Sequence, residues 1–141
     1  MNKPYWLRMQ FGPEVVAIVR EALKAKLWRG LPLERLEKLR ALNRRMSEHY
    51  GVPTCSISIQ NTLIGPHYRP GDDAIVLDKV SLVSWAHEFG HHLLHCRQKP
   101  QQEVYPRSFS LSLFYRAAPR MFETARQDGR LLYTEGEANA Q

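Results

Sequence analysis

The sequence lacks the features that mark membrane-spanning proteins and disulfide-stapled secreted proteins. It contains no run of about 18 apolar residues, the length that a membrane-spanning helix requires. Residues 1–8 carry neither an apolar stretch nor a small-residue cleavage site, so we expect no secretory signal. Cys55 and Cys96 are too few for a disulfide framework, and a reducing compartment is the default. These absences predict a cytoplasmic protein without membrane association.

Repeats, low-complexity tracts and a strong compositional bias are also missing. Hydrophobic residues make up 43% of the chain and charged residues 24%, as in ordinary globular proteins, which argues against disorder. A length of 141 residues leaves no room for a second independent core. We therefore expect one domain over residues 1–141, with a helical amino-terminal part at 1–52 and the remaining elements at 53–141.

Acidic residues are outnumbered by basic ones, 14 against 20, so the net charge is +6 and the isoelectric point about 9.6. Such a balance favours an acidic partner, nucleic acid above all. Between Arg20 and Arg45, however, glutamates are interleaved with the basic residues, as on the solvent side of amphipathic helices. No helix-turn-helix signature, RNA-binding aromatic motif or paired Cys/His finger accompanies the charge. The charge therefore allows weak, non-specific contact with DNA or with an acidic protein.

Apolar spacing predicts two helices in the amino-terminal third. The first begins at Pro13 and Glu14, because proline is tolerated and an acidic residue is favourable in a first turn, and it ends at Gly30. The second begins near Leu33 and ends at residues 51–53, Gly-Val-Pro. Both apolar stripes are typical of core packing.

The pattern then changes to a period of two. Residues 55–60 alternate strictly, as in a strand with one buried face, and residues 74–77, Ala-Ile-Val-Leu, form a second short strand. Residues 61–73 between them are rich in glycine, proline and aspartate, so we expect a loop.

The rest of the chain is predicted to be helical with one long connection. The expected elements are a helix capped by Asp78 or Ser81 and ending near Cys96, a polar connection over residues 97–107, a helix over residues 111–125 with a kink or boundary at Pro119, a break at residues 128–129, and a further helix starting at residue 133. The order of helices, a small sheet and more helices indicates an α+β fold.

The most informative feature is a cluster of four histidines within nine residues, His87 to His95. It opens with His87-Glu88-Phe89-Gly90-His91, which matches the H-E-x-x-H pattern. On a helix, His87 and His91 lie about 40° apart and one turn apart in height, so both imidazoles can reach one small cation at about 2.1 Å. They project almost opposite to the apolar stripe of this helix. We therefore predict a Zn²⁺ site with His87 and His91 as ligands.

Glu88 lies beside the two histidines but follows His87 too closely to be an easy third ligand. Its natural role is that of general base, which takes a proton from a metal-activated water. The alternative is a surface helix that merely carries histidines.

A catalytic zinc site needs a third protein ligand. His95 is unsuitable, because along a continuous helix it lies about 12 Å from His87, and no glycine after His91 breaks the helix. His92 points to another side. We expect His95 at most to orient a ligand, and Cys96 to be a small buried thiol.

The strand at residues 74–77 followed by Trp85-Ala86-His87-Glu88-Phe89-Gly90-His91-His92-Leu93-Leu94-His95 resembles the ImmA/IrrE family of zinc metallopeptidases. Near the end of the chain, Glu135-Gly136-Glu137-Ala138-Asn139 looks like the family's second motif, whose glutamate supplies the third zinc ligand. The resemblance covers about half of the chain.

The resemblance implies a zincin-like, minimal metallopeptidase fold, with helices packed on a small sheet. By position in the motif, it makes Glu135 the third ligand and Asn139 a residue that orients a histidine. Glu137 is a close rival to Glu135, and Glu123 a distant one.

The resemblance further implies an intracellular, gluzincin-like endopeptidase whose protein substrate is a regulator such as a helix-turn-helix repressor. The basic surface would then help to approach a repressor on DNA, and the strand at 74–77 would hold the substrate in extended form. An SprT-like, DNA-associated protease is a weaker alternative, because its third ligand is a later histidine and none follows His95. A third possibility is a non-catalytic regulator in which zinc only stabilises a DNA- or protein-binding fold. The sequence leaves the oligomeric state open.

Overall fold

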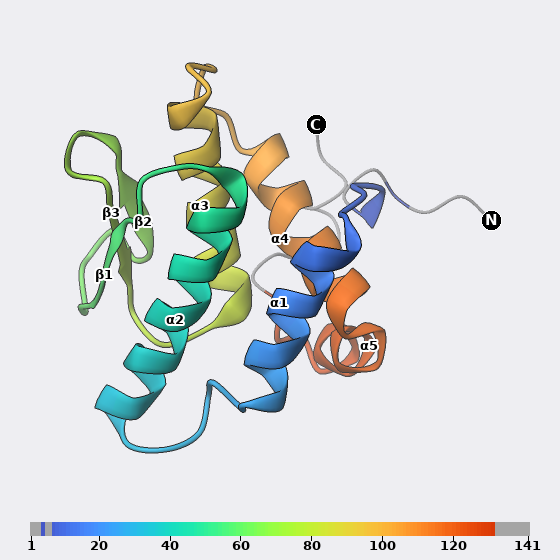
Figure 1. The fold of residues 1–141 in the computed structure, drawn as a ribbon. Helices are drawn as coiled ribbons and strands as arrows, with labels where there is room; N and C mark the ends of the chain where they lie inside the picture. Colours follow the sequence, from blue (N-terminus) through green and yellow to red (C-terminus); the bar gives the residue numbers. More distant parts are fainter. Residues whose placement is uncertain (1–3, 5–6, 132–141) are drawn as a thin grey trace.

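The computed structural model describes Pro4 and residues 7–131 of the chain. Within this part, five α-helices and a small three-stranded sheet form a mixed α+β fold, as predicted (Figure 1). The elements are α1 Pro13–Lys24, α2 Pro32–Tyr50, β1 Ser56–Ile59, β2 His67–Arg69, β3 Ala74–Leu77, α3 Leu82–Cys96, α4 Val104–Ala117 and α5 Pro119–Gln127, with a short 3-10 helix at Pro70–Asp72 between β2 and β3.

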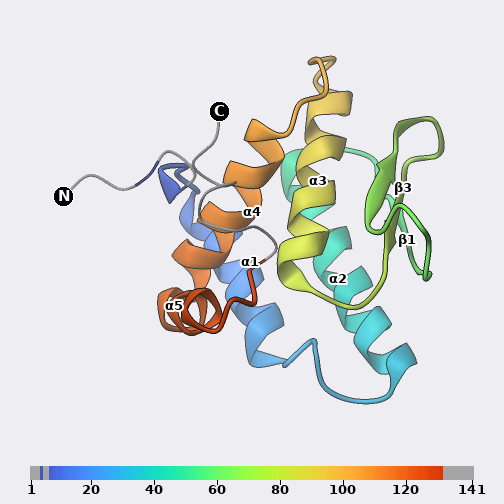
Figure 2. The ribbon, with the colours of Figure 1, turned by 180° about the vertical axis from the view of Figure 1, so that it is seen from behind.

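The elements are arranged in layers. The sheet lies on one side of the molecule, α2 and α3 lie beside it, and α1 and α4 lie beyond them, with α5 farthest from the sheet (Figures 1 and 2). Helix α3 is therefore central, and it packs against α4 on one side and against β2 and β3 on the other. Across residues 7–131, no helix combines the length and the apolar character needed to cross a membrane.

The first helix starts at Pro13 as predicted but ends at Lys24, earlier than Gly30. The chain leaves the helix through Lys26, which has a φ of 54° in the left-handed region. The apolar spacing continued past this point because Leu27, in the turn, still points into the core and is only 1% exposed. The buried position of Leu27 extends the apolar period beyond the helix, so the predicted helix end at Gly30 is wrong.

The second helix ends as its sequence predicts. Gly51 takes the left-handed conformation with a φ of 66°, and its backbone N–H and that of Val52 bond to carbonyls of the last turn. Glycine adopts this conformation without steric cost, which explains its position at the helix end.

The sheet has the order β1–β3–β2, with β1 parallel and β2 antiparallel to β3. The strands expected at residues 55–60 and 74–77 are confirmed, but residues 74–77 form the central strand, so their expected role as the substrate-holding edge is wrong. The two edges are β1 and β2, and β2 lies within a segment expected to be a loop. Its three residues, between Pro66 and Pro70, are too few to show a period of two.

Helix α4 begins at Val104, so the polar connection is shorter than predicted, and Pro119 is a helix boundary rather than a kink. The start was missed because the amino-terminal half of α4 carries no apolar stripe. Ser108, Ser110 and Ser112 of α4 are all buried, since this helix is enclosed by its neighbours on several sides.

One hydrophobic cluster draws on all five helices and on the sheet. It contains Val19, Leu39, Ile75, Phe89 and Phe122, each of which is 0% exposed. Residues 7–52 and residues 53–131 therefore bury their apolar faces against each other. Helix α3 contributes Phe89 to this shared core.

A buried amide adds specific polar contacts to the core. The Trp85 indole N–H donates to Asn43 Oδ1 at 3.0 Å, and Asn43 Nδ2 donates to the Cys55 carbonyl at 3.0 Å. One side chain of α2 thereby joins α3 to the start of β1.

Candidate metal centre

Helix α3 carries the site and begins where its cap is satisfied. Ser81 is the N-cap, and its hydroxyl accepts a hydrogen bond from the Ser84 backbone N–H at 3.3 Å. Of the two caps predicted, Asp78 and Ser81, the structure uses Ser81. The cap sets the start of the helix and hence the direction in which His87, Glu88 and His91 project.

The polar side of α3 is more enclosed than a surface stripe would be. His87 is 6% exposed and Glu88 is 5% exposed, because β2 and the link between α3 and α4 cover this side. His92, which was expected to point to another side, is fully buried. A cleft of about 410 Å³ remains over the site. Its described lining residues are Pro66, His67, Tyr68, Pro70, His87, Glu88, His91, Gln101 and Glu103.

The H-E-x-x-H residues converge as the spacing predicts. The rings of His87 and His91 have their centroids 5.0 Å apart. His87, Glu88 and His91 each offer a ligand atom within 4.8 Å of the others. This group could hold a metal ion.

Glu103, which precedes α4, brings a second carboxylate to the same place. Its Oε2 lies 3.0 Å from His87 Nε2 and its Oε1 lies 3.2 Å from His91 Nε2. The two ring nitrogens that would bind a cation thus face one carboxylate. Two imidazoles and a carboxylate are a donor set that zinc accepts, so the residues present fit this metal.

The sequence pattern does not predict a role for Glu103. The residue was placed inside a polar connection that was expected to reach residue 107, and nothing local linked it to histidines twelve or more positions away. A usable signal was present, because an acidic residue is favoured at the amino-terminal end of a helix, and Glu103 stands directly before the helical residues.

Burial shifts the pKa values of His87 and Glu88 in opposite directions. Burial lowers the pKa of His87 to about 4, and the neighbouring Glu103 carboxylate partly opposes this. Its imidazole is therefore unprotonated at neutral pH, as a metal ligand must be. Burial, aided by the charge of Glu103, raises the pKa of Glu88 to about 7. A carboxylate in this range can both accept and return a proton near neutral pH.

The two ring nitrogens of His91 have different partners. Nε2 faces Glu103, whereas Nδ1 lies 2.7 Å from Gln101 Oε1. The Gln101 amide nitrogen also donates to the His91 backbone carbonyl at 3.0 Å. Gln101 is a second residue of the link that the sequence did not single out.

His92 and His95 are not brought to the site, as expected. The His92 ring uses both nitrogens elsewhere, with Nε2 at 2.7 Å from the Pro53 carbonyl and Nδ1 at 2.7 Å from the Tyr68 hydroxyl. His95 is exposed, and its ring centroid lies 6.1 Å from that of Tyr68. Cys96, expected to be buried, is only partly so, and burial raises the pKa of its thiol.

The glutamates that the sequence favoured as third ligand differ in outcome. Glu135 and Glu137, together with Asn139, lie outside the described residues, so Glu135 stays a prediction. Glu123 lies on α5, the helix farthest from the sheet, where its carboxylate is 3.6 Å from Arg126 (Figure 2). The structure does not bring Glu123 to the histidines.

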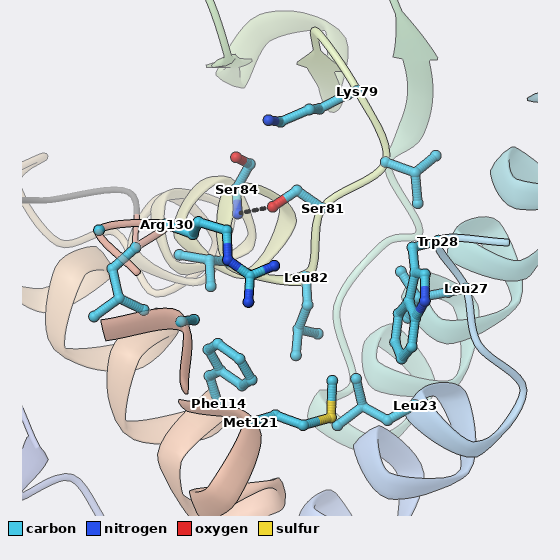
Figure 3. A pocket seen from close by; sticks show the side chains of 15 residues that line it. Leu23, Leu27, Trp28, Lys79, Ser81, Leu82, Ser84, Phe114, Met121 and Arg130 are labelled. Atoms are coloured by element: carbon cyan, nitrogen blue, oxygen red, sulfur yellow. Dashed lines mark hydrogen bonds between the residues drawn. The ribbon is translucent and has the colours of Figure 1, made fainter. Parts of the chain in front are cut away.

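A larger groove of about 770 Å³ lies at the amino-terminal end of α3 (Figure 3). Its lining includes the apolar side chains of Leu23, Leu27, Trp28, Phe114 and Met121, with the side chains of Lys79 and Arg130 above them in the view of Figure 3. Its described lining residues include no imidazole and no carboxylate. Of these two hollows, the smaller cleft is the one lined by imidazoles and carboxylates.

Comparisons of this chain with protein families, with curated proteins and with solved structures found no match.

Proposed function

We propose that this protein is a zinc-dependent endopeptidase in which His87, His91 and Glu103 hold the metal and Glu88 is the general base. The observation that carries the proposal is the Glu103 carboxylate, which faces the Nε2 atoms of both histidines at 3.0 and 3.2 Å. Three ligands suit catalytic zinc, which keeps one position open, whereas structural zinc is bound by four.

A bound zinc ion would supply Lewis acidity, which acidifies water and polarises a peptide carbonyl. The work of Glu88 is then to hold a proton. Its position next to His87 and its enclosed surroundings let it take a proton from water and deliver it to the leaving amine. A cation nearby lowers the pKa of a carboxyl group, which favours the charged form of Glu88 that the first step requires.

The substrate would enter as an extended chain along β2. This strand is an edge of the sheet, and His67 and Tyr68 from it line the cleft beside His87 and Glu88. An exposed edge can pair with a peptide through backbone hydrogen bonds. The resemblance to ImmA/IrrE peptidases suggests a helix-turn-helix repressor as the protein cleaved.

A non-catalytic regulator stabilised by zinc is the second candidate. It gives no reason for a buried carboxylate beside the ligands, because a structural site needs no base and burial of Glu88 is unfavourable. The SprT-like alternative requires a histidine as third ligand. His67 is the remaining histidine on the cleft, and its nitrogens are engaged by the Gly65 carbonyl at 2.8 Å and by Arg69 Nε at 3.2 Å.

The test combines zinc stoichiometry with hydrolysis of a labelled, unfolded casein and of a helix-turn-helix repressor. We expect Glu88→Gln to keep one zinc per chain while its hydrolysis falls about 10²–10⁴-fold. His91→Ala and Glu103→Ala should lose the metal, whereas Glu135→Ala should retain it.

The results separate the candidates. Loss of zinc in Glu135→Ala with retention in Glu103→Ala would show that the tail supplies the ligand and that our choice of Glu103 is wrong. Stoichiometric zinc in the unaltered protein without hydrolysis of either substrate would favour the regulator.

A further inference from the structure

Gln101 makes two contacts with His91 that together define how its amide is oriented. Its Nε2 lies 3.0 Å from the His91 backbone carbonyl, and its Oε1 lies 2.7 Å from His91 Nδ1. A carbonyl oxygen only accepts hydrogen bonds, so the amide NH₂ must face it. The amide oxygen is then left facing the ring, and because that oxygen also only accepts, it favours a proton on His91 Nδ1. The Glu103 carboxylate is an acceptor for Nε2, but its contact of 3.2 Å is longer than the 2.7 Å contact with Gln101, so the Gln101 contact decides the tautomer.

We propose that Gln101 is a positioning residue that selects the tautomer of His91 in which Nδ1 bears the proton and Nε2 has a free lone pair. This inference rests on the proposed zinc site. Nε2 is the atom that lies 3.2 Å from Glu103 Oε1, where the metal would bind. The hydrogen bond made by one ring nitrogen of a histidine decides which nitrogen can bind a metal.

The neighbouring histidine shows the same rule with the opposite result. His92 Nε2 lies 2.7 Å from the Pro53 carbonyl, an acceptor, so Nε2 carries the proton. Its Nδ1 then accepts from the Tyr68 hydroxyl at 2.7 Å. Two consecutive histidines of α3 therefore hold opposite tautomers, because they face different partners. Of these two histidines, only His91 directs an unprotonated Nε2 toward the proposed metal position beside Glu103.

The position of Gln101 in the chain strengthens the assignment. It lies two residues before Glu103, in the link between α3 and α4. The amide also donates to the backbone carbonyl of His91, whose ring it orients, so the link is held at a fixed position relative to that ring. One short segment thus supplies a metal-facing carboxylate and the group that prepares a histidine for the same metal.

The experiment measures the His91 tautomer and zinc affinity separately. ¹⁵N NMR of the imidazole nitrogens, recorded on metal-free protein with neutral histidines, reports the tautomer. Competition with a chromophoric chelator reports the affinity for Zn²⁺. We expect Gln101→Ala to shift His91 toward the Nε2–H form and to weaken zinc binding about 10–100-fold.

Two further variants separate orientation from folding. Gln101→Glu keeps an acceptor for Nδ1–H, so it should keep the tautomer and bind zinc within a few-fold of the unaltered protein. Gln102→Ala is the matched control, because Gln102 Oε1 accepts from the Tyr105 backbone N–H and does not contact His91. It should leave both the tautomer and the zinc affinity unchanged.

An unchanged His91 tautomer in Gln101→Ala would overturn the inference, as would zinc binding as weak in Gln101→Glu as in Gln101→Ala. If the unaltered protein bound no zinc, the proposed function would fail. The NMR comparison of metal-free proteins would still decide the role of Gln101.

Discussion

At the scale of single residues, burial changes the pKa of the site's histidine and of its glutamate, whose charged forms have opposite sign. Removal from water disfavours a charged imidazole and a charged carboxylate alike, so it lowers the pKa of His87 and raises that of Glu88. The result is an unprotonated ligand next to a carboxyl group that exchanges its proton near neutral pH. Neither property follows from the residue types alone.

The raised pKa of Glu88 predicts a pH-dependent loss of stability in the metal-free protein. Folded Glu88 keeps its proton up to about pH 7, whereas the unfolded chain releases it near the ordinary value of 4.5. Between these values stability therefore falls as pH rises. Relative to the native protein, Glu88→Gln should gain free energy of unfolding across this window, by on the order of 2 kcal/mol above pH 7.

Urea denaturation at several pH values checks this prediction. The lowered pKa of His87 acts in the opposite direction, since stability from an unprotonated imidazole is lost as pH falls from 6.5 toward 4. Both proteins contain His87, so its effect cancels to first order in their difference. A difference that is independent of pH would contradict the raised pKa of Glu88.

Asn43 is the second residue whose effect depends on burial. It is 1% exposed and bonds to Trp85 Nε1 and to the Cys55 carbonyl. Asn43→Leu would leave both partners buried and unpaired, at about 1–3 kcal/mol each. We expect urea denaturation to show a loss of roughly 2–4 kcal/mol. Asn61→Leu, at an exposed loop position, is the control, and equal effects at both sites would show that the buried bonds contribute little.

At the scale of elements, the site depends on how closely α4 approaches α3. A Cβ built on Gly90 would lie 2.8 Å from Pro106 Cα and 3.2 Å from Pro106 Cβ. Only a residue without a side chain permits this contact. Because Pro106 follows Glu103 by three residues, the same contact determines how near the carboxylate comes to His87 and His91.

Gly90→Ala tests this coupling. Alanine normally stabilises a helix relative to glycine by about 1 kcal/mol, but here the added methyl would push against backbone. We expect a net loss of about 1–3 kcal/mol in the free energy of unfolding, together with weaker zinc binding measured by chelator competition. Gly12→Ala, where no atom lies within 4 Å, should leave zinc affinity unchanged. Unaltered zinc binding in Gly90→Ala would show that Glu103 is not held by this contact.

At the scale of the whole molecule, part of the positive charge serves the fold. Arg20 Nε donates to the Ala117 carbonyl at 3.1 Å, Arg40 donates to the Ile57 carbonyl at 3.0 Å, and Lys38 bonds to two carbonyls of the turn after α1. Arg45 also pairs with Glu21. These side chains bind α1 and α2 to neighbouring segments. The net charge of +6 therefore overstates the number of positive charges available to bind a partner.

We therefore expect DNA binding that is weak, independent of sequence and strongly dependent on salt. Fluorescence anisotropy with two unrelated duplexes should give similar affinities at about 50 mM salt and little binding at about 200 mM. Preference for one duplex would contradict this prediction.

Neutralising the exposed Lys24 and Arg44 should slow cleavage of a DNA-bound repressor, and undiminished cleavage would remove the proposed role of the basic surface.

Local patterns determined much of what the sequence predicted. Pro13, Gly51 and Ser81 mark helix ends through the conformation or hydrogen bond of one residue, and the strand at 74–77 is a contiguous apolar run. The convergence of His87 and His91 follows from helix geometry, because residues four positions apart share a face. Each of these features is encoded in neighbouring residues, so it can be read before the chain is folded.

Tertiary packing decided the rest. The edge position of β2, the burial that moves the pKa of Glu88 to about 7, and the carboxylate of Glu103 beside two histidines all arise between segments distant along the chain. No local period encodes them, because they depend on α4 meeting α3 at Gly90 and on the link that this contact holds over the cleft. The sequence by itself placed two histidines and a glutamate on one side of a helix, whereas only the packed molecule brought a second carboxylate, that of Glu103, to them.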